Sequence, residues 1–380
     1  MNVFFIKTID RYFGTVLCFF LGIFKKKQSL KETRKVLFIQ LWGIGETICT
    51  LPTLKALKNK YRNSSVHVLC TERNKDVYES VDFIDKMLLV RLSILDLARF
   101  AATHYNEFDI VIDMEEYLNI SSILAFFVGK YRIGYGGQAR SVLYDKTASY
   151  KANQHVVLTY FDLVRQIGVV GKPTELEPLQ DRTQNEVERL LRQNHLLRKD
   201  KIIGFGTGAA ESSRCRKWPE ERFAQLADEL VKKYKSKIIL IGSSYEIAEI
   251  DSIIDKMKNK DAATNLAGKT TAKQLFGIIA RMLLFVGNDS GPMHIAACQG
   301  IPTVGLFGPN LPSRFGPYGK NNSAVYKGNI CGYSPCINVH LGQTPDCLYP
   351  KDSEDYQKCM KNIFVDDVIK AIEGIFHAKR

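Results

Sequence analysis

The sequence predicts an α/β protein built from two doubly wound, Rossmann-like domains. In both halves of the chain, short apolar strand candidates alternate with helical stretches, and a segment containing proline and glycine separates the halves. This alternation is typical of parallel sheets that helices cover on both faces. At 380 residues the chain is long enough for each half to bury a core of its own.

Residues 1–33 precede this pattern and predict an amphipathic, membrane-associating segment. Residues 12–24 form a mostly apolar run of 13 residues, which is shorter than the ~18 to 20 residues that a spanning helix needs. The cluster Lys25-Lys26-Lys27 follows the run, whereas a signal peptide carries its basic residues in front, and no small-residue cleavage site appears. We expect an interfacial helix with these lysines on anionic headgroups. A helix packed on the protein's own surface is the alternative.

If the segment only binds the membrane, removal of residues 1–27 should leave the rest of the chain folded.

The domain boundaries follow from the remaining pattern. Residues 34–170 form the first domain, and residues 171–180 form a linker because their prolines break helices and cannot continue a central strand. Residues 181–362 form the second domain, with a cysteine-rich insert at 331–359, and residues 363–380 form a C-terminal helix. The expected strands are 36–41, 66–70, 110–113, 201–205, 237–241, 283–286 and 303–307, and the expected helices are 48–60, 220–234, 245–257 and 366–376.

The net charge of +13, from 53 Lys and Arg against 40 Asp and Glu, favours a polyanionic partner. An anionic membrane and a phosphorylated glycolipid both fit this charge. We expect no nucleic acid partner, because no zinc-finger, RNP or basic-heptad pattern is present.

The cysteines do not form the pattern of a secreted disulfide framework, since five of the nine are scattered. The other four are spaced C-x4-C-x10-C-x11-C, without the close pairs of common zinc sites. A zinc site, a disulfide and free thiols remain open for these four residues, which are Cys331, Cys336, Cys347 and Cys359.

A turn after the expected strand at 283–286 predicts a phosphate site. It carries Asp289, Ser290 and Gly291, and a helix begins near Pro292. Unpaired backbone N–H groups and the positive end of a helix dipole then meet at the turn, where an anion can bind.

Three motifs resemble the glycosyltransferase family 9 heptosyltransferases, which build the inner core of lipopolysaccharide. The first is Asp-Ser-Gly-x-x-His-x-Ala-Ala at 289–297, followed by Gly-x-Pro-x-x-x-Leu-Phe-Gly-Pro at 300–309. The second is the strand, glycine-rich turn and helix at 36–54, and the third is the basic-Trp-Pro stretch at 216–223. They occur in the family's order over roughly residues 34–376.

The resemblance implies a GT-B fold, in which the two domains face a central cleft and the C-terminal helix closes back on the N-terminal half. It implies an inverting transferase in the cytoplasm, peripheral on the inner face of the cytoplasmic membrane. The donor would be a nucleotide-diphospho sugar, ADP-heptose in particular, and the acceptor the Kdo-lipid A end of the core. No Asp-x-Asp triplet appears, so we expect no metal and no cofactor.

The resemblance places the donor in the second domain. Arg216 or Lys217 would clamp the diphosphate opposite the small-residue loop at Thr207, and the family's usual lysine is replaced by Arg216, which leaves the choice open. The alternative is a solvated basic loop with Trp218 in the core.

Two further donor contacts are expected, from Glu246 to the ribose and from His294 to a phosphate or sugar oxygen. Without the resemblance, Glu246 would only complement a helix dipole and His294 would be structural. The expected donor-binding residues are Thr207, Arg216, Lys217, Glu246, Asp289, Ser290, Gly291 and His294.

Glu46 is the expected general base, although the family usually carries Asp at this position. A glutamate adds one methylene, so its carboxylate must retract by roughly 1.5 Å for the same attack geometry. The alternative is a lost base, with Glu46 only favouring a helix. Gly43 and Gly45 would let a ligand approach the backbone closely.

Arg132 and Arg140 are expected to meet acidic groups of the acceptor, and an exposed charge run is the alternative. Three other functions stay open: transfer from another nucleotide sugar, a GT-B sugar-nucleotide epimerase, and a non-catalytic nucleotide- or glycolipid-binding relative.

Overall fold

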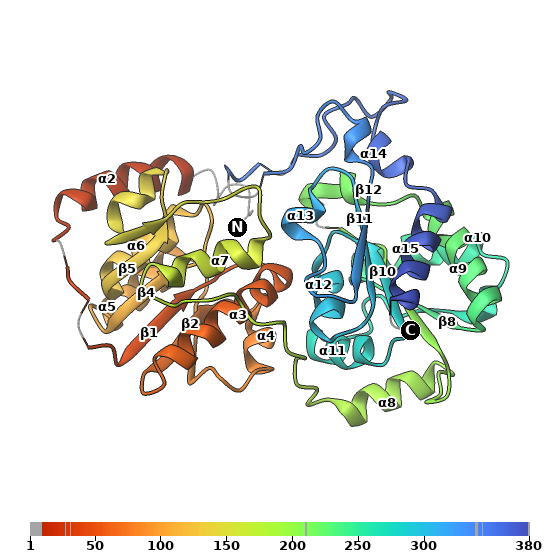
Figure 1. Ribbon diagram of the computed structural model, residues 1–380, viewed down its shortest axis with the longest axis horizontal. Coiled ribbons are helices and arrows are strands. Elements are labelled where there is room, and N and C mark those ends of the chain that lie inside the picture. Colours follow the sequence, from red (N-terminus) through yellow and green to blue (C-terminus); the bar gives the residue numbers. More distant parts are fainter. Residues whose placement is uncertain are drawn as a thin grey trace. The chain divides into compact units, whose positions relative to one another are not determined.

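In the computed structural model, the chain is described for residues 10–26, 28–30, 32–209, 211–338, 341–343 and 345–378, apart from the side chains of residues 211 and 212. It divides into two compact units (Figure 1), the first comprising Met1–Thr174 with Val339–Gly342 and the second Glu175–Asn338 with Gln343–Arg380. Each unit contains one six-stranded sheet.

The sheet of the first unit is parallel throughout, with strand order β3-β2-β1-β4-β5-β6. Its central strand reads Lys-Val-Leu-Phe-Ile, and four of these five residues are buried because helices cover both faces. Phe38 pairs with Val68 on one side and with Ile112 on the other. The strands are β1 (Lys35–Ile39), β2 (Ser65–Cys70), β3 (Lys86–Leu89), β4 (Phe108–Asp113), β5 (Gly129–Tyr135) and β6 (Lys146–Ala148).

Five helices and one 3-10 turn follow these strands. They are α3 (Ile44–Lys60), α4 (Lys75–Glu79), α5 (Ile94–Thr103), α6 (Asn119–Val128), η2 (Ala139–Leu143, a 3-10 turn) and α7 (Val156–Arg165). Helix α3 begins four residues before the expected start, so Glu46 lies inside its first turn.

The N-terminal segment packs on the first unit as a π-helical turn, η1 (Asp10–Gly14), that continues into α2 (Thr15–Ile23). The Asp10 carboxylate accepts hydrogen bonds from the N–H groups of Asn119 (2.9 Å) and Ile120 (2.7 Å), at the start of α6. Leu118, at the N-cap of α6, offers no side-chain cap, so Asp10 supplies one from elsewhere in the chain.

These contacts correct the expectation that residues 1–27 can be removed without consequence, since Asp10 belongs to the folded unit. Lys25 also donates a hydrogen bond to the carbonyl of Tyr144. Lys27 and residues 1–9 lie outside the described residues. Among the described helices, none combines the length and apolarity needed to cross a membrane.

The sheet of the second unit repeats the same plan, with order β12-β11-β10-β7-β8-β9 and parallel pairing throughout. Its strands are β7 (Ile202–Gly206), β8 (Lys237–Ile241), β9 (Ala263–Asn265), β10 (Leu284–Asn288), β11 (Thr303–Phe307) and β12 (Asn322–Tyr326). The helices are α8 (Gln184–Gln193), α9 (Glu220–Tyr234), α10 (Ile247–Lys256), α11 (Ala272–Ala280), α12 (Gly291–Cys298), α13 (Pro312–Phe315), α14 (Lys358–Lys361) and α15 (Val365–His377), with 3-10 turns η3 (Glu211–Arg216), η4 (Ser244–Glu246), η5 (Lys260–Ala262) and η6 (Gly328–Ile330).

The C-terminal helix α15 packs within the second unit, against β12, α9 and β11. The expectation that it closes back on the N-terminal half concerns the placement of the two units and stays a prediction. Val368, Ile372 and Ile375 join the same hydrophobic core as the residues of β7 and β8. The apolar face of α15 is therefore used to cover its own sheet.

Both sheets confirm the predicted fold class of two doubly wound α/β domains. In each, the first three strands run outward from the centre and the last three run outward from the same centre in the opposite direction. The predicted central cleft concerns the placement of the two units and stays a prediction.

Asp10 provides a direct test of the N-terminal packing. We expect Asp10→Ala to lower the free energy of unfolding of the first unit by about 1 kcal/mol, because α6 loses its cap. Urea unfolding measures this loss. Asp82→Ala, which removes an exposed carboxylate from the same unit, is the control. Equal stability of the two variants would contradict the capping role.

Candidate functional site

In the first unit, candidate site residues gather where the strand order reverses, between β1 and β4. These strands are neighbours, and the connections that leave their carboxyl ends lead in opposite directions along the sheet. Ligands of doubly wound sheets bind at this kind of position. Residues 40–43 follow β1, and residues 114–118 follow β4.

The turn after β1 depends on Gly43, which has φ +58° at the N-cap of α3. A Cβ on this residue would lie 1.8 Å from Glu46 Oε2, so the glutamate carboxylate folds back over the glycine. The side chain of Thr47 donates to the Gly43 carbonyl (2.7 Å) and accepts from Asn74 Nδ2 (2.9 Å). These hydrogen bonds stabilise the turn, and Glu46 lies at the N-terminus of α3, the positive end of the helix dipole. Gly45 is buried in the same turn of the helix.

The connection after β4 carries three buried acids that the sequence analysis did not single out: Asp113, Glu115 and Glu116. The Glu115 side chain accepts a hydrogen bond from the N–H of Leu41, and so ties this loop to the one after β1. Burial, opposed by this hydrogen bond and reinforced by nearby Asp113, raises the pKa of Glu115 to about 8. The carboxylate of Glu46 contributes a smaller part of this rise.

Glu115 is therefore a protonated acid at neutral pH beside the expected base. The sequence signal that would have found this loop is the run Asp-Met-Glu-Glu directly after a buried strand.

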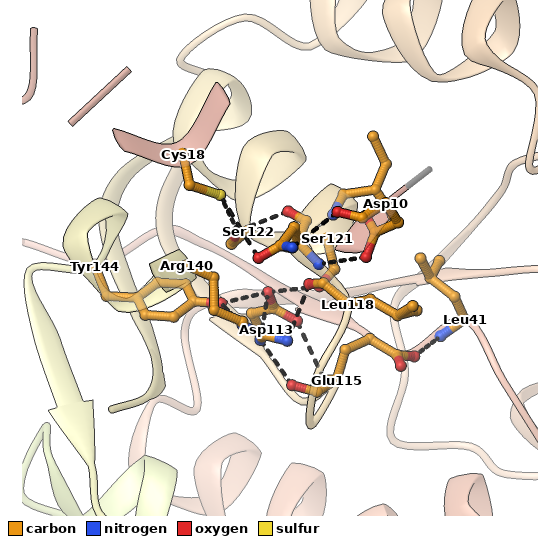
Figure 2. A network of polar contacts seen from close by, with 12 residues as sticks. Asp10, Cys18, Leu41, Asp113, Glu115, Leu118, Ser121, Ser122, Arg140 and Tyr144 are labelled. Carbon is orange, nitrogen blue, oxygen red and sulfur yellow. Dashed lines mark hydrogen bonds and ion pairs between the residues drawn. The ribbon is translucent and has the colours of Figure 1, made fainter. Parts of the chain in front are cut away.

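Arg140 lies inside this network and does not present its charge to an acceptor. It is completely buried, and its guanidinium donates to Asp113 Oδ2 (3.0 Å) and to the carbonyls of Glu115 (2.7 Å) and Leu118 (3.0 Å), as Figure 2 shows. The hydroxyl of Tyr144 donates to the same carboxylate (2.6 Å).

Arg132 is also buried, in a bidentate pair with Asp145 (2.8 and 3.2 Å) and against the ring of Phe126. The geometry gives both arginines structural partners, because each is paired with a buried carboxylate. Neither is carried into the proposed site.

In the second unit, the equivalent reversal lies between β7 and β10, and Asn288 at the end of β10 organises it. Its amide donates to the carbonyl of Thr207 (2.6 Å), and its oxygen accepts from the N–H of Trp218 (3.1 Å). Trp218 is buried and donates through its ring N–H to the carbonyl of Ile363 (2.9 Å). The three expected donor segments, around Thr207, Arg216 and Asp289, therefore meet at one amide.

Arg216 and Lys217 have different surroundings, which bears on the choice left open by the sequence. Arg216 Nη1 lies 3.3 Å from the carbonyl of Asp289 and 3.5 Å from its carboxylate, so it faces the turn. Lys217 pairs with Glu249 on α10 instead. Of the two cations, Arg216 is the one beside the expected phosphate turn.

Three buried polar atoms in these loops have no hydrogen-bond partner among the described residues. They are Thr207 Oγ1, Ser213 Oγ and Arg216 Nε. Buried polar groups are nearly always paired, because an unpaired one costs about 1 to 3 kcal/mol. All three atoms belong to the segment that follows β7, and an oxygen-rich ligand bound there would supply the missing partners.

Asp289 and the start of α12 complete this side. The Asp289 carboxylate is buried and accepts from Asn310 Nδ2 (2.9 Å), in the connection after β11. Ser290 is the N-cap of α12 and makes no side-chain cap, and Gly291 opens the helix. His294 is buried within the same helix.

Glu246 closes a capping box in which its carboxylate accepts from Ser243 N–H (2.7 Å) and Oγ (2.9 Å). The other oxygen faces Gly208, where a Cβ would lie only 1.9 Å away. The structure thus gives Glu246 a capping role at the start of η4, and its contact with a ribose stays a prediction.

Three of the four cysteines in the cysteine-rich segment are partly exposed, and Cys359 is buried. A hydrogen bond with the Cys215 thiol lowers the pKa of Cys336 to about 7. Within the described part of the chain, no group of three or more His, Cys, Asp or Glu side chains is arranged to hold a metal ion.

The family model of glycosyltransferase family 9 (heptosyltransferase) matches residues 99–338 of the sequence. The chain belongs to this family. It is therefore a glycosyltransferase, as the sequence analysis predicted.

Similar proteins agree with this assignment. A lipooligosaccharide heptosyltransferase 2 from Haemophilus influenzae is 26% identical over 294 residues, covering 73% of this chain and 84% of that protein. A lipopolysaccharide heptosyltransferase 1 from Campylobacter coli is 22% identical over 350 residues, covering 88% of this chain and all of that protein.

Among solved structures, a family 9 glycosyl transferase from Veillonella parvula superimposes with a TM-score of 0.76 at 22% identity, covering 93% of this chain and all of that one. The ADP-heptose lps heptosyltransferase II of E. coli gives 0.69 at 19% identity, covering 91% and 99%. These two likenesses confirm the GT-B type of fold.

The proton on Glu115 should appear in the pH dependence of stability. Because the folded chain holds this proton up to about pH 8 while an unfolded glutamate releases it near ~4.3, the free energy of unfolding should fall as pH rises between these values, by up to about 1.4 kcal/mol per pH unit. Glu115→Gln, which carries no titrating proton, should lose this slope.

Urea unfolding at several pH values measures the difference between the wild type and the variant. Glu72→Gln, an exposed glutamate in the same unit, is the control. Parallel curves for wild type and Glu115→Gln would contradict the buried, protonated state.

Proposed function

We propose that this protein is an inverting, metal-independent heptosyltransferase that moves heptose from ADP-heptose to the inner core, in the Kdo-lipid A region, of lipopolysaccharide. It would act in the cytoplasm, at the inner face of the cytoplasmic membrane. Family membership supports transfer of a heptose, and the names of the similar proteins support lipopolysaccharide as the acceptor class. The observation that carries the donor side is the position of Arg216 beside the Asp289 turn, with its buried Nε unpaired among the described residues.

On the donor side, Arg216 and the N–H groups at the start of α12 would bind the diphosphate. The guanidinium already faces the Asp289 turn, and its unpaired Nε can donate to a phosphate oxygen without breaking another hydrogen bond. Thr207 Oγ1 would add a hydroxyl to the same ligand. As the bond from the anomeric carbon to the diphosphate breaks, ADP leaves with the bonding electrons, and these donors stabilise its growing charge.

The same proposed site includes three residues because they lie at the start of α12: Ser290, Gly291 and His294.

On the acceptor side, Glu46 would take the proton of the acceptor hydroxyl as its oxygen attacks the anomeric carbon from the face opposite the leaving ADP. The carboxylate is half-buried, lies against Gly43, and receives no hydrogen bond from any residue that the structure describes. An acceptor of protons needs such an unoccupied oxygen. Gly43 and Gly45 would let the sugar approach this turn.

A screen of nucleotide-sugar donors against core-truncated lipopolysaccharide, with products identified by mass spectrometry, tests the proposed reaction. A heptose added to the lipid from ADP-heptose supports it. Addition of a different sugar would assign another donor, and an isomerised free nucleotide sugar would assign an epimerase. Binding of ADP without turnover of any donor would assign a non-catalytic role.

Arg216→Ala should weaken binding of ADP by about 10-fold or more and lower turnover with it, because a charged hydrogen bond to phosphate is lost. Isothermal titration with ADP measures the affinity. Lys217→Ala removes the same charge one residue along and is the matched control, since Lys217 pairs with Glu249. A larger effect from Lys217 than from Arg216 would reverse the assignment.

Glu46→Gln should lower turnover by a factor of about 10² to 10⁴ and leave ADP affinity little changed, because the side chain keeps its shape and loses only the proton acceptor. Glu46→Asp should retain substantial activity, since it keeps a carboxylate and restores the residue usual in the family. Single-turnover kinetics with saturating donor separate chemistry from binding. Near wild-type turnover of Glu46→Gln would remove the base assignment.

A further inference from the structure

The N-terminal helices expose an apolar face that no described residue covers. Eight large apolar side chains of η1 and α2 are between 41% and 77% exposed, and five of them are aromatic. We call this set the apolar helix face; it comprises Tyr12, Phe13, Val16, Leu17, Phe19, Phe20, Ile23 and Phe24. Their spacing of three and four residues places them along one side of the helix.

The opposite side of the helix is fixed to the first unit. Cys18 is completely buried, with its sulfur 3.6 Å from Ser122 Oγ and 3.8 Å from Asn119 Oδ1. Gly14 and Gly22 allow the close approach, because a Cβ on either would lie 2.7 Å from Asn119 and 3.0 Å from Val142, respectively. Figure 1 shows α2 alongside α6 at the edge of the unit.

A surface helix usually turns its apolar side inward and its polar side to water. Here the inward side carries glycines and buries Cys18 and Leu21 in a small apolar cluster with Ile123 and Leu143, while the outward side is apolar as well. The capping of α6 by Asp10 prevents the helix from rolling over. Contiguous apolar patches larger than a few hundred Å² are rare on the free surface of soluble proteins and mark interaction sites.

The charges around the face select the kind of partner. Residues 12–24 contain no charged side chain, whereas Arg11 precedes them and Lys25 and Lys26 follow. Arg11 and Lys26 are exposed, and Lys25 is held at the end of α2 by its bond to Tyr144. An apolar, aromatic strip bordered by cations is the pattern of helices that lie in the interface of an anionic bilayer.

The length of the helix fits this orientation. The helical residues of η1 and α2, Asp10–Gly14 and Thr15–Ile23, extend over roughly 20 Å, less than the ~30 Å of a hydrocarbon core.

We propose that the apolar helix face is a docking surface for an anionic lipid bilayer, on which it lies parallel to the membrane plane. The docking helix is joined through Asp10 to α6, and Ser121 of α6 donates to Asp113 at the end of β4 (2.8 Å). Docking therefore fixes how the loops beside Glu46 are oriented relative to the lipid surface. Lipid binding does not depend on the proposed function. Only the advantage of orienting the Glu46 loops toward a lipid-linked acceptor rests on that function.

Sedimentation of the full-length protein with vesicles of phosphatidylethanolamine and phosphatidylglycerol tests the proposal. In Phe13→Ser/Ile23→Ser, which replaces side chains that are 74% and 77% exposed, binding should fall by about 10-fold or more. Ile94→Ser/Leu95→Ser is the matched control, because these side chains on α5 are 74% and 83% exposed in the same unit. It should bind like the wild type. Binding should also weaken with added salt and on vesicles of phosphatidylcholine alone.

Equal vesicle binding by the two double variants would overturn the proposal. So would a wild-type dimer, seen by analytical ultracentrifugation, that only Phe13→Ser/Ile23→Ser dissociates, since a second copy would then cover the face. Vesicle binding that behaves as expected in a protein that transfers no heptose would leave the docking surface intact and remove only the proposed function.

Discussion

The first unit depends on the buried ion pair between Asp113 and Arg140. Both side chains are inaccessible to solvent, and burial of two charges is costly unless good geometry and further hydrogen bonds offset it. The hydroxyls of Tyr144 and Ser121 donate to the same carboxylate, and the remaining guanidinium donors reach two carbonyls of the loop after β4. The ion pair therefore fixes the path of the loop after β4. Through the hydrogen bond from the N–H of Leu41 to Glu115, this loop is connected to the turn that carries Glu46.

The second unit achieves the same order with a neutral side chain. Asn288 connects the Thr207 loop to Trp218 through its amide, so a neutral side chain holds the backbone in place. Arg216 is not needed for this purpose, and its buried Nε has no partner among the described residues. Arg140 and Arg216 show two uses of one residue type. Four protein acceptors satisfy Arg140, namely the Asp113 carboxylate, the Glu115 and Leu118 carbonyls and the Tyr144 hydroxyl. Arg216 remains partly unsatisfied at the expected donor turn.

The strands and the doubly wound order could be predicted because they depend on local patterns. Lys237–Ile241 and Thr303–Phe307 form strands where continuous apolar runs predicted them. Arg140 could not be separated from Arg216 in this way, since its partner Asp113 lies 27 residues earlier in the sequence. The packing of α15 on its own sheet could not be predicted for a related reason: an apolar helix face predicts burial, and it does not say which sheet provides the cover.

Glu115 was missed because its importance arises from tertiary burial and from the charge of a residue on another loop. Two carboxyl groups that share a water-poor site repel each other when both are ionised, so the more buried one retains its proton. Glu115 is fully buried, and this burial is the largest cause that raises its pKa to about 8. The hydrogen bond from Leu41 to Glu115 sets the relative position of the loops after β1 and β4. A longer side chain than the family's aspartate fits the turn after β1, because Glu46 reaches back over Gly43 while the backbone around it stays braced by Thr47.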